Sequence, residues 1–298
     1  MDVAITGASG LIGTALARSL EADGHHVIPM VRSGPARPGV IQWSPDAGTI
    51  DAAGLEGIDA VVHLAGEGIA ERRWNDAQKQ RILTSRTTGT SLLATTLASL
   101  QRPPKVLLSS SAIGYYGERG TDVLDETSAP GQGFLSDVCV AWESAAAPAA
   151  TAGVRVATLR TGIVLSRDGG ALQKMLPLFR LGVGGRFGNG HQIWSWISLH
   201  DHLAAVRHLL EHDVHGPVNL TAPHPVANAA FAKALAHAVH RPALFPVPKF
   251  GPSILLGGEL AQNLLYTSAD VRPAALADSG FVFAHPDIDT ALAAVLER

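Results

Sequence analysis

The sequence predicts an α/β fold in which helices cover both faces of a doubly wound parallel sheet. Strand-like and helix-like segments alternate through residues 1–165, and the inner strand-like segments are apolar on both faces, as buried parallel strands are. In residues 166–298 the alternation weakens, and glycine- and proline-rich stretches become frequent. We therefore expect a main unit at 1–165 and a smaller mixed unit at 166–298, with segments near 199–222 as candidates to return to the main sheet.

Strands and helices are expected in alternation along the main unit. The strands are expected at residues 3–5, 26–31, 40–43, 59–66, 105–108 and 154–160. The helices are expected at residues 11–23, 75–100 and 134–147. Right-handed crossovers between parallel strands place the carboxyl ends of the strands at one edge of the sheet, which is where ligands bind. Candidate site residues are therefore those that follow each strand.

Three glycines follow the first strand at intervals of three, at Gly7, Gly10 and Gly13. Gly7 permits a tight turn, Gly10 removes a Cβ where backbone must approach a pyrophosphate, and Gly13 lets the helix pack closely on the strand. The helix N-terminus adds free N–H groups and a partial positive charge. The alternative is an ordinary βα turn of small residues, but its place on the first strand favours a dinucleotide ligand.

Arg32 follows the second strand, at the position that distinguishes the two nicotinamide dinucleotides. Folds that prefer NAD usually place Asp or Glu there to hold the ribose 2′-hydroxyl, whereas arginine suits the 2′-phosphate of NADP. No acidic residue is expected beside Arg32 to repel that phosphate. A solvated loop arginine is the alternative interpretation, but with the glycine motif before it the sequence favours NADP.

Composition and charge exclude several classes of protein. The 298 residues are 46% hydrophobic and 16% charged, as in a compact globular enzyme. The formal net charge of −3 gives no reason to expect nucleic acid or an anionic membrane as a partner. Cys139 is the single cysteine, so no internal disulfide can form and a cytoplasmic location is expected. No apolar run reaches the roughly 20 residues of a membrane helix, and no signal peptide is expected before the first strand.

Several motifs together resemble one family. The chain resembles the extended short-chain dehydrogenases/reductases at residues 6–13, 86–90, 109–112 and 115–117. The chain also resembles one branch of that family, the atypical, epimerase-like branch that has its own C-terminal domain. This second resemblance lies at residues 64–67, 73–74, 160–165, 196–201, 219–223 and 280–283. This resemblance covers nearly the whole chain. It implies a Rossmann sheet, NADP as the cofactor and a C-terminal substrate domain, in an oxidoreductase or nucleotide-sugar epimerase-like enzyme acting on a small polar substrate.

The resemblance also assigns a cofactor-binding role to single residues. Those it implies are Gly7, Ser9, Gly10, Leu11, Ile12, Gly13, Arg32, Leu64, Ala65, Arg86 and Val164. Of these, Ser9 to Ile12 would hold the pyrophosphate, and Arg32 would hold the 2′-phosphate. Leu64 and Ala65 would flank the adenosine and nicotinamide side of the cofactor. Val164, after the sixth strand, would meet the nicotinamide through its backbone.

Three positions depart from the family pattern. Arg86 stands where extended members usually have an asparagine facing the cofactor, so a cationic contact with a phosphate or ribose is expected. The family also carries Tyr-x-x-x-Lys on the helix after the fifth strand. Counting back from Glu143 puts Leu135 at the tyrosine position and Cys139 at the lysine position. The usual proton donor and its neighbouring ammonium are therefore absent.

The resemblance places the catalytic serine of the family at Ser111, whose four-residue spacing to Tyr115 matches the family's. Without the usual tyrosine, another group must protonate the alkoxide that hydride transfer produces. Tyr115 is favoured over Tyr116 by its spacing to Ser111. The alternative function, favoured by the loss of the Tyr–Lys pair, is a non-catalytic NADP-binding protein that senses redox ratio and signals through a partner.

Other chemistries have less support. No His-Glu-x-x-His motif and no cysteine pair occur, so no metal site is expected. In the closest cluster, His200-Asp201-His202, the i, i+2 spacing separates the imidazoles around a helix start, and we interpret His200 and Asp201 as capping or pocket residues. Neither a Gly-x-Ser-x-Gly elbow nor a Walker lysine is present, which argues against a serine hydrolase and an NTPase.

Packing and assembly give the last expectations. Trp194 is expected in the core, Trp196 and Tyr115 are expected to line the substrate cleft, and Cys139 is expected to pack as a small hydrophobic residue. Extended relatives often pair through the helices after the fourth and fifth strands, here 75–100 and 134–147. A homodimer is therefore expected, with a monomer as the alternative.

Overall fold

The computed structural model of the chain describes residues 1–33, 38–243 and 246–297. Its centre is an eight-stranded sheet in which every neighbouring pair of strands is parallel except β3 and β4. In spatial order the strands are β12 (Gly216–Leu220), β8 (Arg155–Thr161), β6 (Val106–Ala112), β5 (Ala60–His63), β1 (Asp2–Thr6), β2 (His26–Val31), β3 (Ile41–Ser44) and β4 (Thr49–Ile50). The strand order reverses between β1 and β5, and ligands of such sheets bind at the carboxyl ends beside the reversal.

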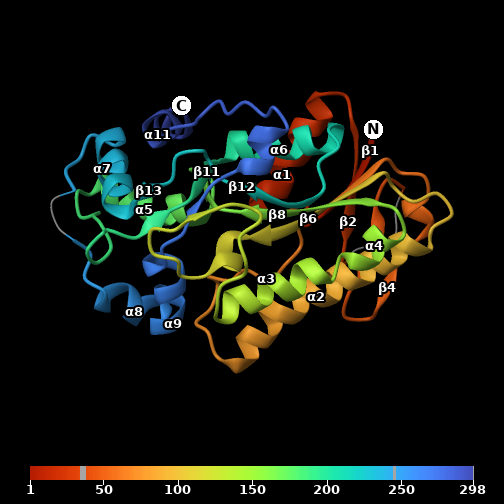
Figure 1. Cartoon of the computed structure of the whole chain (residues 1–298), viewed down its shortest axis with the longest axis horizontal. Coiled ribbons are helices and arrows are strands. Elements are labelled where there is room, and N and C mark those ends of the chain that lie inside the picture. The colour runs from red at the N-terminus through yellow and green to blue at the C-terminus, as the bar shows by residue number, and fades with distance from the viewer. Residues whose placement is uncertain (34–37, 244–245, 298) are drawn as a thin grey trace.

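Helices cover both faces of this sheet (Figure 1). On one face lie α1 (Leu11–Ala22) and α6 (Leu199–Glu211), and on the other α2 (Asp76–Ser99), α3 (Phe134–Ser144) and α4 (Ala147–Thr151). The longer helices bury stripes of residues spaced three or four apart, as Leu16 and Leu20 show in α1. Both leucines are fully buried, and each contributes about 1.5–3 kcal/mol of hydrophobic stabilisation.

The second half of the chain builds a smaller unit with its own core. Its helices are α5 (Gly170–Arg180), α7 (Asn228–Ala238), α8 (Phe250–Leu256), α9 (Gly258–Ala261) and α11 (Ile288–Leu296). The short α10 (Ala274–Asp278) packs instead on β12 of the main sheet. Short strand pairs join β9 (Ile163–Leu165) to β11 (Trp196–Ser198), β10 (Ile193–Trp194) to β13 (Val226–Ala227), and β7 (Val123–Leu124) to β14 (Asp270–Val271). The single turns are η1 (Ala53–Leu55), η2 (Ile113–Tyr116) and the π-helical η3 (Gln262–Tyr266). Leu172, Phe231 and Leu292, from α5, α7 and α11, meet in this second core.

The predicted fold class is confirmed, and the differences from prediction are local. The helix expected at 134–147 ends at Ser144, and α4 starts separately at Ala147. Pro148 explains the break, because proline fits the first turn of a helix but cannot continue one. The two-residue edge strand β4 was too short to predict. Between residues 199 and 222, α6 packs on α1 and β12 pairs with β8.

The prediction for Trp196 was wrong, since its side chain is fully buried and lines no cleft. The core position of Trp194 is confirmed at 4% exposure. Over the part of the chain that the structure describes, no helix has both the length and the apolar character needed to cross a membrane.

Candidate functional site

The turn between β1 and α1 shows what its glycines do. Gly7 has a left-handed φ of 67°, and a Cβ there would lie 3.0 Å from backbone atoms of Leu64 and Ala65. A Cβ on Gly13 would overlap the carbonyl oxygen of Gly7. Gly10 differs, because its Cβ would meet only the Gly7 oxygen, at 3.4 Å, and would otherwise enter open space. No side chain caps α1 at Gly10, so this turn fits an anion held by the N–H groups of the first helical turn.

The start of α5 lies against the same turn. Gly169 caps α5, and a Cβ on it would lie 2.9 Å from the side chain of Leu11, the first residue of α1. Gly170 has a φ of 70°, and its Cβ would lie 3.7 Å from the carbonyl oxygen of Val164. Two helix N-termini therefore approach one corner, and both carry partial positive charge. The corner is suited to a doubly charged group such as a pyrophosphate.

A buried polar chain fixes the segment that follows β5. Oγ1 of Thr6 accepts hydrogen bonds from the N–H groups of Leu64 and Ala65 and lies 2.7 Å from Nδ1 of His63. Nε2 of His63 lies 3.0 Å from Oγ1 of Thr90 on α2. Burial lowers the pKa of His63 to about 4, so this imidazole is neutral near neutral pH. Leu64 and Ala65, the residues after β5 that were predicted to contact the cofactor, are thus held against the end of β1.

Arg32 is exposed at the end of β2, on the rim of a hollow of about 360 Å³. Gln42, Trp43 and Asp51 line the same hollow. The expectation that no acidic residue stands beside Arg32 was wrong, because the unpredicted strand β4 pairs with β3 and places Asp51 on the same hollow. Its Oδ1 accepts a hydrogen bond of 3.3 Å from the N–H of Gly54.

Ser111, near the end of β6, belongs to a buried ionic network. Its Oγ donates a hydrogen bond of 2.7 Å to Oε1 of Glu143 on α3. Arg160, its neighbour across the β6–β8 pairing, donates from Nε to Oε1 at 2.8 Å and from Nη2 to Oε2 at 2.9 Å. Burial opposes the charge on Arg160, but hydrogen bonds to Glu143 and Tyr116 raise its pKa above the usual value. Because the Ser111 hydrogen is used by Glu143, the lone pairs of its oxygen are what it offers to a ligand.

The two tyrosines of η2 have different surroundings. The fully buried Tyr116 donates from its hydroxyl to Oδ1 of Asn219 at 2.7 Å and accepts from Arg160 at 3.0 Å. Burial raises its pKa to about 12. Tyr115 is half-buried, and the centre of its ring lies 3.5 Å from the guanidinium carbon of Arg160. Its hydroxyl has no hydrogen bond within the ranges that the structure describes, so of this pair it is the phenol available to a ligand.

Leu135 and Cys139 lie beside this loop, at the positions where the family carries its Tyr and Lys. A Cβ on Gly114 would lie 3.2 Å from Cβ of Leu135 and 3.8 Å from Sγ of Cys139. The thiol donates to the carbonyl oxygen of Ala112 at 3.5 Å, and burial raises its pKa to about 11. Cys139 is therefore a neutral, packed thiol, as predicted.

Arg86 faces the segment after β5 from α2. Its Nη1 donates to the carbonyl oxygens of Glu67, at 2.9 Å, and Ile82, at 3.1 Å. Its guanidinium also stacks over the Trp142 ring at 4.8 Å, and burial lowers its pKa below the usual value. A guanidinium has five N–H donors, so Arg86 still has donors for a phosphate or ribose oxygen.

The structure brings most of the predicted residues to one edge of the sheet. The glycine turn follows β1, Leu64 and Ala65 follow β5, Ser111 ends β6, and Val164 lies on β9 beyond β8. Leu64 and Val164 pack on the same core cluster. Arg32 lies farther along this edge, after β2.

Glu143 and Arg160 were missed as site residues. The sequence signal that could have identified them was a charged residue in an apolar strand, Arg160, and another on the buried face of a helix, Glu143. Such charges are rarely buried unless they are paired.

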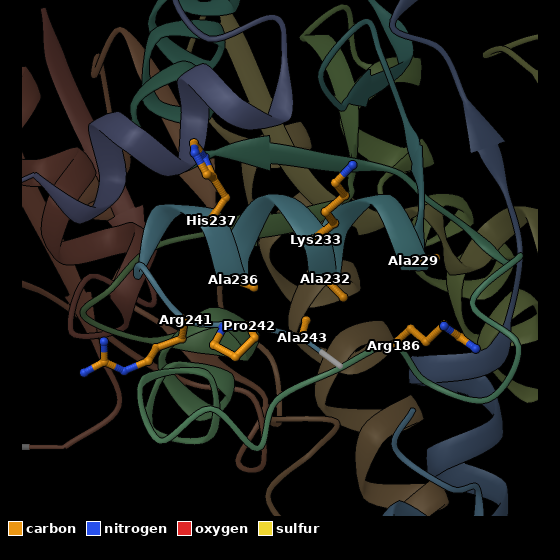
Figure 2. A pocket seen from close by; sticks show the side chains of 9 residues that line it. All are labelled: Arg186, Ala229, Ala232, Lys233, Ala236, His237, Arg241, Pro242 and Ala243. Atoms are coloured by element: carbon orange, nitrogen blue, oxygen red, sulfur yellow. The ribbon is translucent and has the colours of Figure 1, made fainter. Parts of the chain in front are cut away.

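A separate hollow of about 470 Å³ lies on α7, with alanines on its floor and basic residues around it. In Figure 2 the side chains of Lys233 and His237 project from one side of α7, while Arg186 and Arg241 extend away at its two ends. The cations do not converge on one point. None of the predicted site residues lines this hollow, so the candidate site remains the carboxyl edge of the sheet.

Comparison with known proteins places this edge in context. The NAD dependent epimerase/dehydratase family matches residues 3–221, and a domain of unknown function, DUF1731, matches residues 247–295. An epimerase family protein of Mycobacterium bovis is 44% identical over 294 residues, covering 97% of this chain and 96% of the relative. The human epimerase family protein SDR39U1 is 37% identical over 296 residues, covering 98% of this chain and 98% of the relative.

Two solved structures are similar over the whole chain. The crystal structure of human SDR39U1 (isoform 2) with NADPH has a TM-score of 0.88 at 35% identity and covers 99% of both chains. A nucleoside-diphosphate sugar epimerase from Corynebacterium glutamicum has a TM-score of 0.81 at 38% identity, over 99% of this chain and 58% of the other. The resemblance to the epimerase-like branch is thereby confirmed. The chain belongs to the NAD dependent epimerase/dehydratase family.

Proposed function

We propose that this chain binds NADPH along the carboxyl edge of its sheet, as an oxidoreductase or nucleotide-sugar epimerase-like enzyme acting on a small polar substrate. The observation that carries the proposal is the turn at Gly10. There the uncapped start of α1 faces space that one Cβ would enter, and the start of α5 lies beside it. The human relative SDR39U1 was crystallised with NADPH, which supports the same ligand here.

The proposed contacts follow from the geometry of that edge. Ser9 to Ile12 hold the pyrophosphate with backbone N–H groups, and Arg32 holds the 2′-phosphate. Leu64 and Ala65, held by Thr6, flank the adenosine and nicotinamide side. Val164 meets the nicotinamide through its backbone. Arg86 adds a cation behind the segment after β5.

The chemistry divides between the cofactor and the chain. Bound NADPH supplies a hydride, and the residues of the chain orient the substrate and handle its proton. Ser111, whose hydrogen goes to Glu143, accepts a hydrogen bond from a substrate hydroxyl and so orients it. Tyr115 donates the proton to the substrate oxygen. Because Cys139 stands where the family's lysine would assist, turnover is expected to be slow near neutral pH.

A second candidate is a non-catalytic protein that binds NADPH, senses the redox ratio and signals through a partner. The observation that favours it is the pair Leu135 and Cys139. An aliphatic side chain and a neutral buried thiol provide neither the proton donor nor the cation of the family.

A screen of carbonyl substrates with NADPH, followed by nicotinamide absorbance, tests the enzyme proposal. Ser111→Ala and Tyr115→Phe should each reduce turnover by about 100-fold or more while NADPH affinity stays unchanged. Ser110→Ala is the matched control, because successive residues of β6 point to opposite faces of the sheet. Full activity in both variants would refute the assigned roles. Tight NADPH binding without turnover of any substrate would favour the sensor.

A further inference from the structure

Two histidines and an aspartate from distant parts of the chain converge outside the proposed active site. They are His200 and Asp201, in the first turn of α6, and His285, in the segment that leads to α11. One ligand atom from each lies within 4.8 Å of the other two. Nδ1 of His200 is 3.2 Å from Oδ1 of Asp201, and Nδ1 of His285 is 4.0 Å from Oδ2.

The carboxylate of this cluster is held rigidly. The side chain of Asp201 is 1% exposed, and its two oxygens accept hydrogen bonds from the N–H groups of Ala284, at 3.0 Å, and His285, at 2.9 Å. Each oxygen has a second lone pair, and that of Oδ1 meets Nδ1 of His200 at 3.2 Å. Backbone hydrogen bonds of this kind are what orients the carboxylate ligands of metal sites.

The two imidazoles lie beside the carboxylate, and a bound ion would replace the hydrogen bonds that their Nδ1 atoms make now. His200 is 63% exposed, and its hydrogen-bonding partner within the described residues is Asp201. His285 is 17% exposed and also meets the hydroxyl of Ser198 at 3.0 Å. His202, the neighbour considered in the sequence, is fully buried and approaches Thr161 instead. The second imidazole therefore comes from a residue that sequence spacing could not indicate.

We propose that His200, Asp201 and His285 bind Zn²⁺. The bound ion would connect the segment before α11, which carries His285, to the start of α6. Two imidazole nitrogens and one carboxylate oxygen form a common three-ligand set for this ion, with water in the fourth position. Bond lengths of 2.0–2.2 Å require donors about 3.4 Å apart, so small rotations of the two rings close the site. The partial positive charge of the α6 N-terminus opposes the ion, but the carboxylate in the same turn carries a full negative charge.

The position of the site gives the ion a structural role. The segment at Ala284 and His285 leads into α11, whose residues Ile288 and Leu292 are buried against the core formed with α7. An ion that joins this segment to α6 stabilises the docking of α11. Zn²⁺ should therefore raise the melting temperature of the protein, and should slow hydrogen exchange in α11.

Calorimetric titration with zinc chloride tests the site. All proteins carry His212→Gln, because the stacked rings of His208 and His212, 3.7 Å apart, offer another imidazole pair. In that background we expect one Zn²⁺ per chain with micromolar affinity. His200→Gln and His285→Gln should each weaken binding at least about tenfold and remove the rise in melting temperature. His200 is exposed, so its variant leaves the core intact.

His224→Gln is the matched control, because His224 is also exposed and lies 2.8 Å from a carboxylate, that of Asp287 in the same segment. It belongs to no three-ligand cluster among the residues described. Unchanged affinity in this control, with losses in both cluster variants, supports the site. The proposal is overturned if the His212→Gln protein binds Zn²⁺ more weakly than about 1 mM, if adding His200→Gln leaves the affinity unchanged, or if the control loses as much affinity as the cluster variants.

Discussion

Replacing Gly10 by alanine should impair cofactor binding without impairing the fold. Gly10 has φ −77° and ψ 173°, which alanine adopts readily, and its Cβ would meet only the Gly7 oxygen at 3.4 Å. The free energy of unfolding should therefore change by no more than about 0.5 kcal/mol. The same Cβ would displace a pyrophosphate from the start of α1. Losing one hydrogen bond to a charged group costs about 1.5–3 kcal/mol, so NADPH affinity should fall by about 10- to 100-fold.

Gly13→Ala is the matched variant with the opposite expected result. Its Cβ would overlap the backbone oxygen of Gly7, so β1 and α1 must separate and the protein should lose about 3 kcal/mol or more. Urea unfolding measures the stability of both variants, and NADPH fluorescence measures their affinity. Wild-type affinity in Gly10→Ala would show that no phosphate lies at this turn. Wild-type stability in Gly13→Ala would refute the packing argument.

Three further results are expected. Arg160→Met leaves the largely buried Glu143 carboxylate without its cation and should reduce the free energy of unfolding in urea by about 3–5 kcal/mol. Adding Glu143→Met should recover part of this loss. If the effects of the two substitutions simply add, the pairing is contradicted. Burial lowers the pKa of folded His63 to about 4 from 6.5, so its contribution to stability is complete above pH 6.5 and is lost as the pH falls toward 4. Between pH 7.5 and 4.5 the wild type should therefore lose about 2.5 kcal/mol more stability than His63→Gln, and equal losses would refute this. Light scattering at micromolar concentration should give the mass of a dimer, formed through helices α2 and α3, and a mass near one chain would contradict it.

Much of the fold was predictable because its signals are local. The parallel strands read as short apolar runs, and the glycine turn of Gly7, Gly10 and Gly13 is contiguous in sequence. Alternation of strands and helices then implies the sheet and the shared edge where its strands end. Pro148 was also visible, but its ability to start α4 was missed.

The partners of the site residues were not predictable, because they depend on contacts between distant segments. Ser111 meets Glu143, which is 32 residues away, and Asp51 reaches the neighbourhood of Arg32 only through the short β3–β4 hairpin. His285 meets Asp201 across 84 residues. In each case no local sequence pattern marks the two side chains as partners, and only the packed structure brings them together.

Calorimetric titration of NADPH and NADH into wild type and Arg32→Ala tests the proposed cofactor site most directly. NADPH should bind wild type about tenfold or more tightly than NADH, because the exposed guanidinium of Arg32 adds a charge-assisted hydrogen bond to the 2′-phosphate. Arg32→Ala should remove most of that difference and leave NADH affinity unchanged. Equal affinities of wild type for the two cofactors, or no binding of NADPH, would contradict the account.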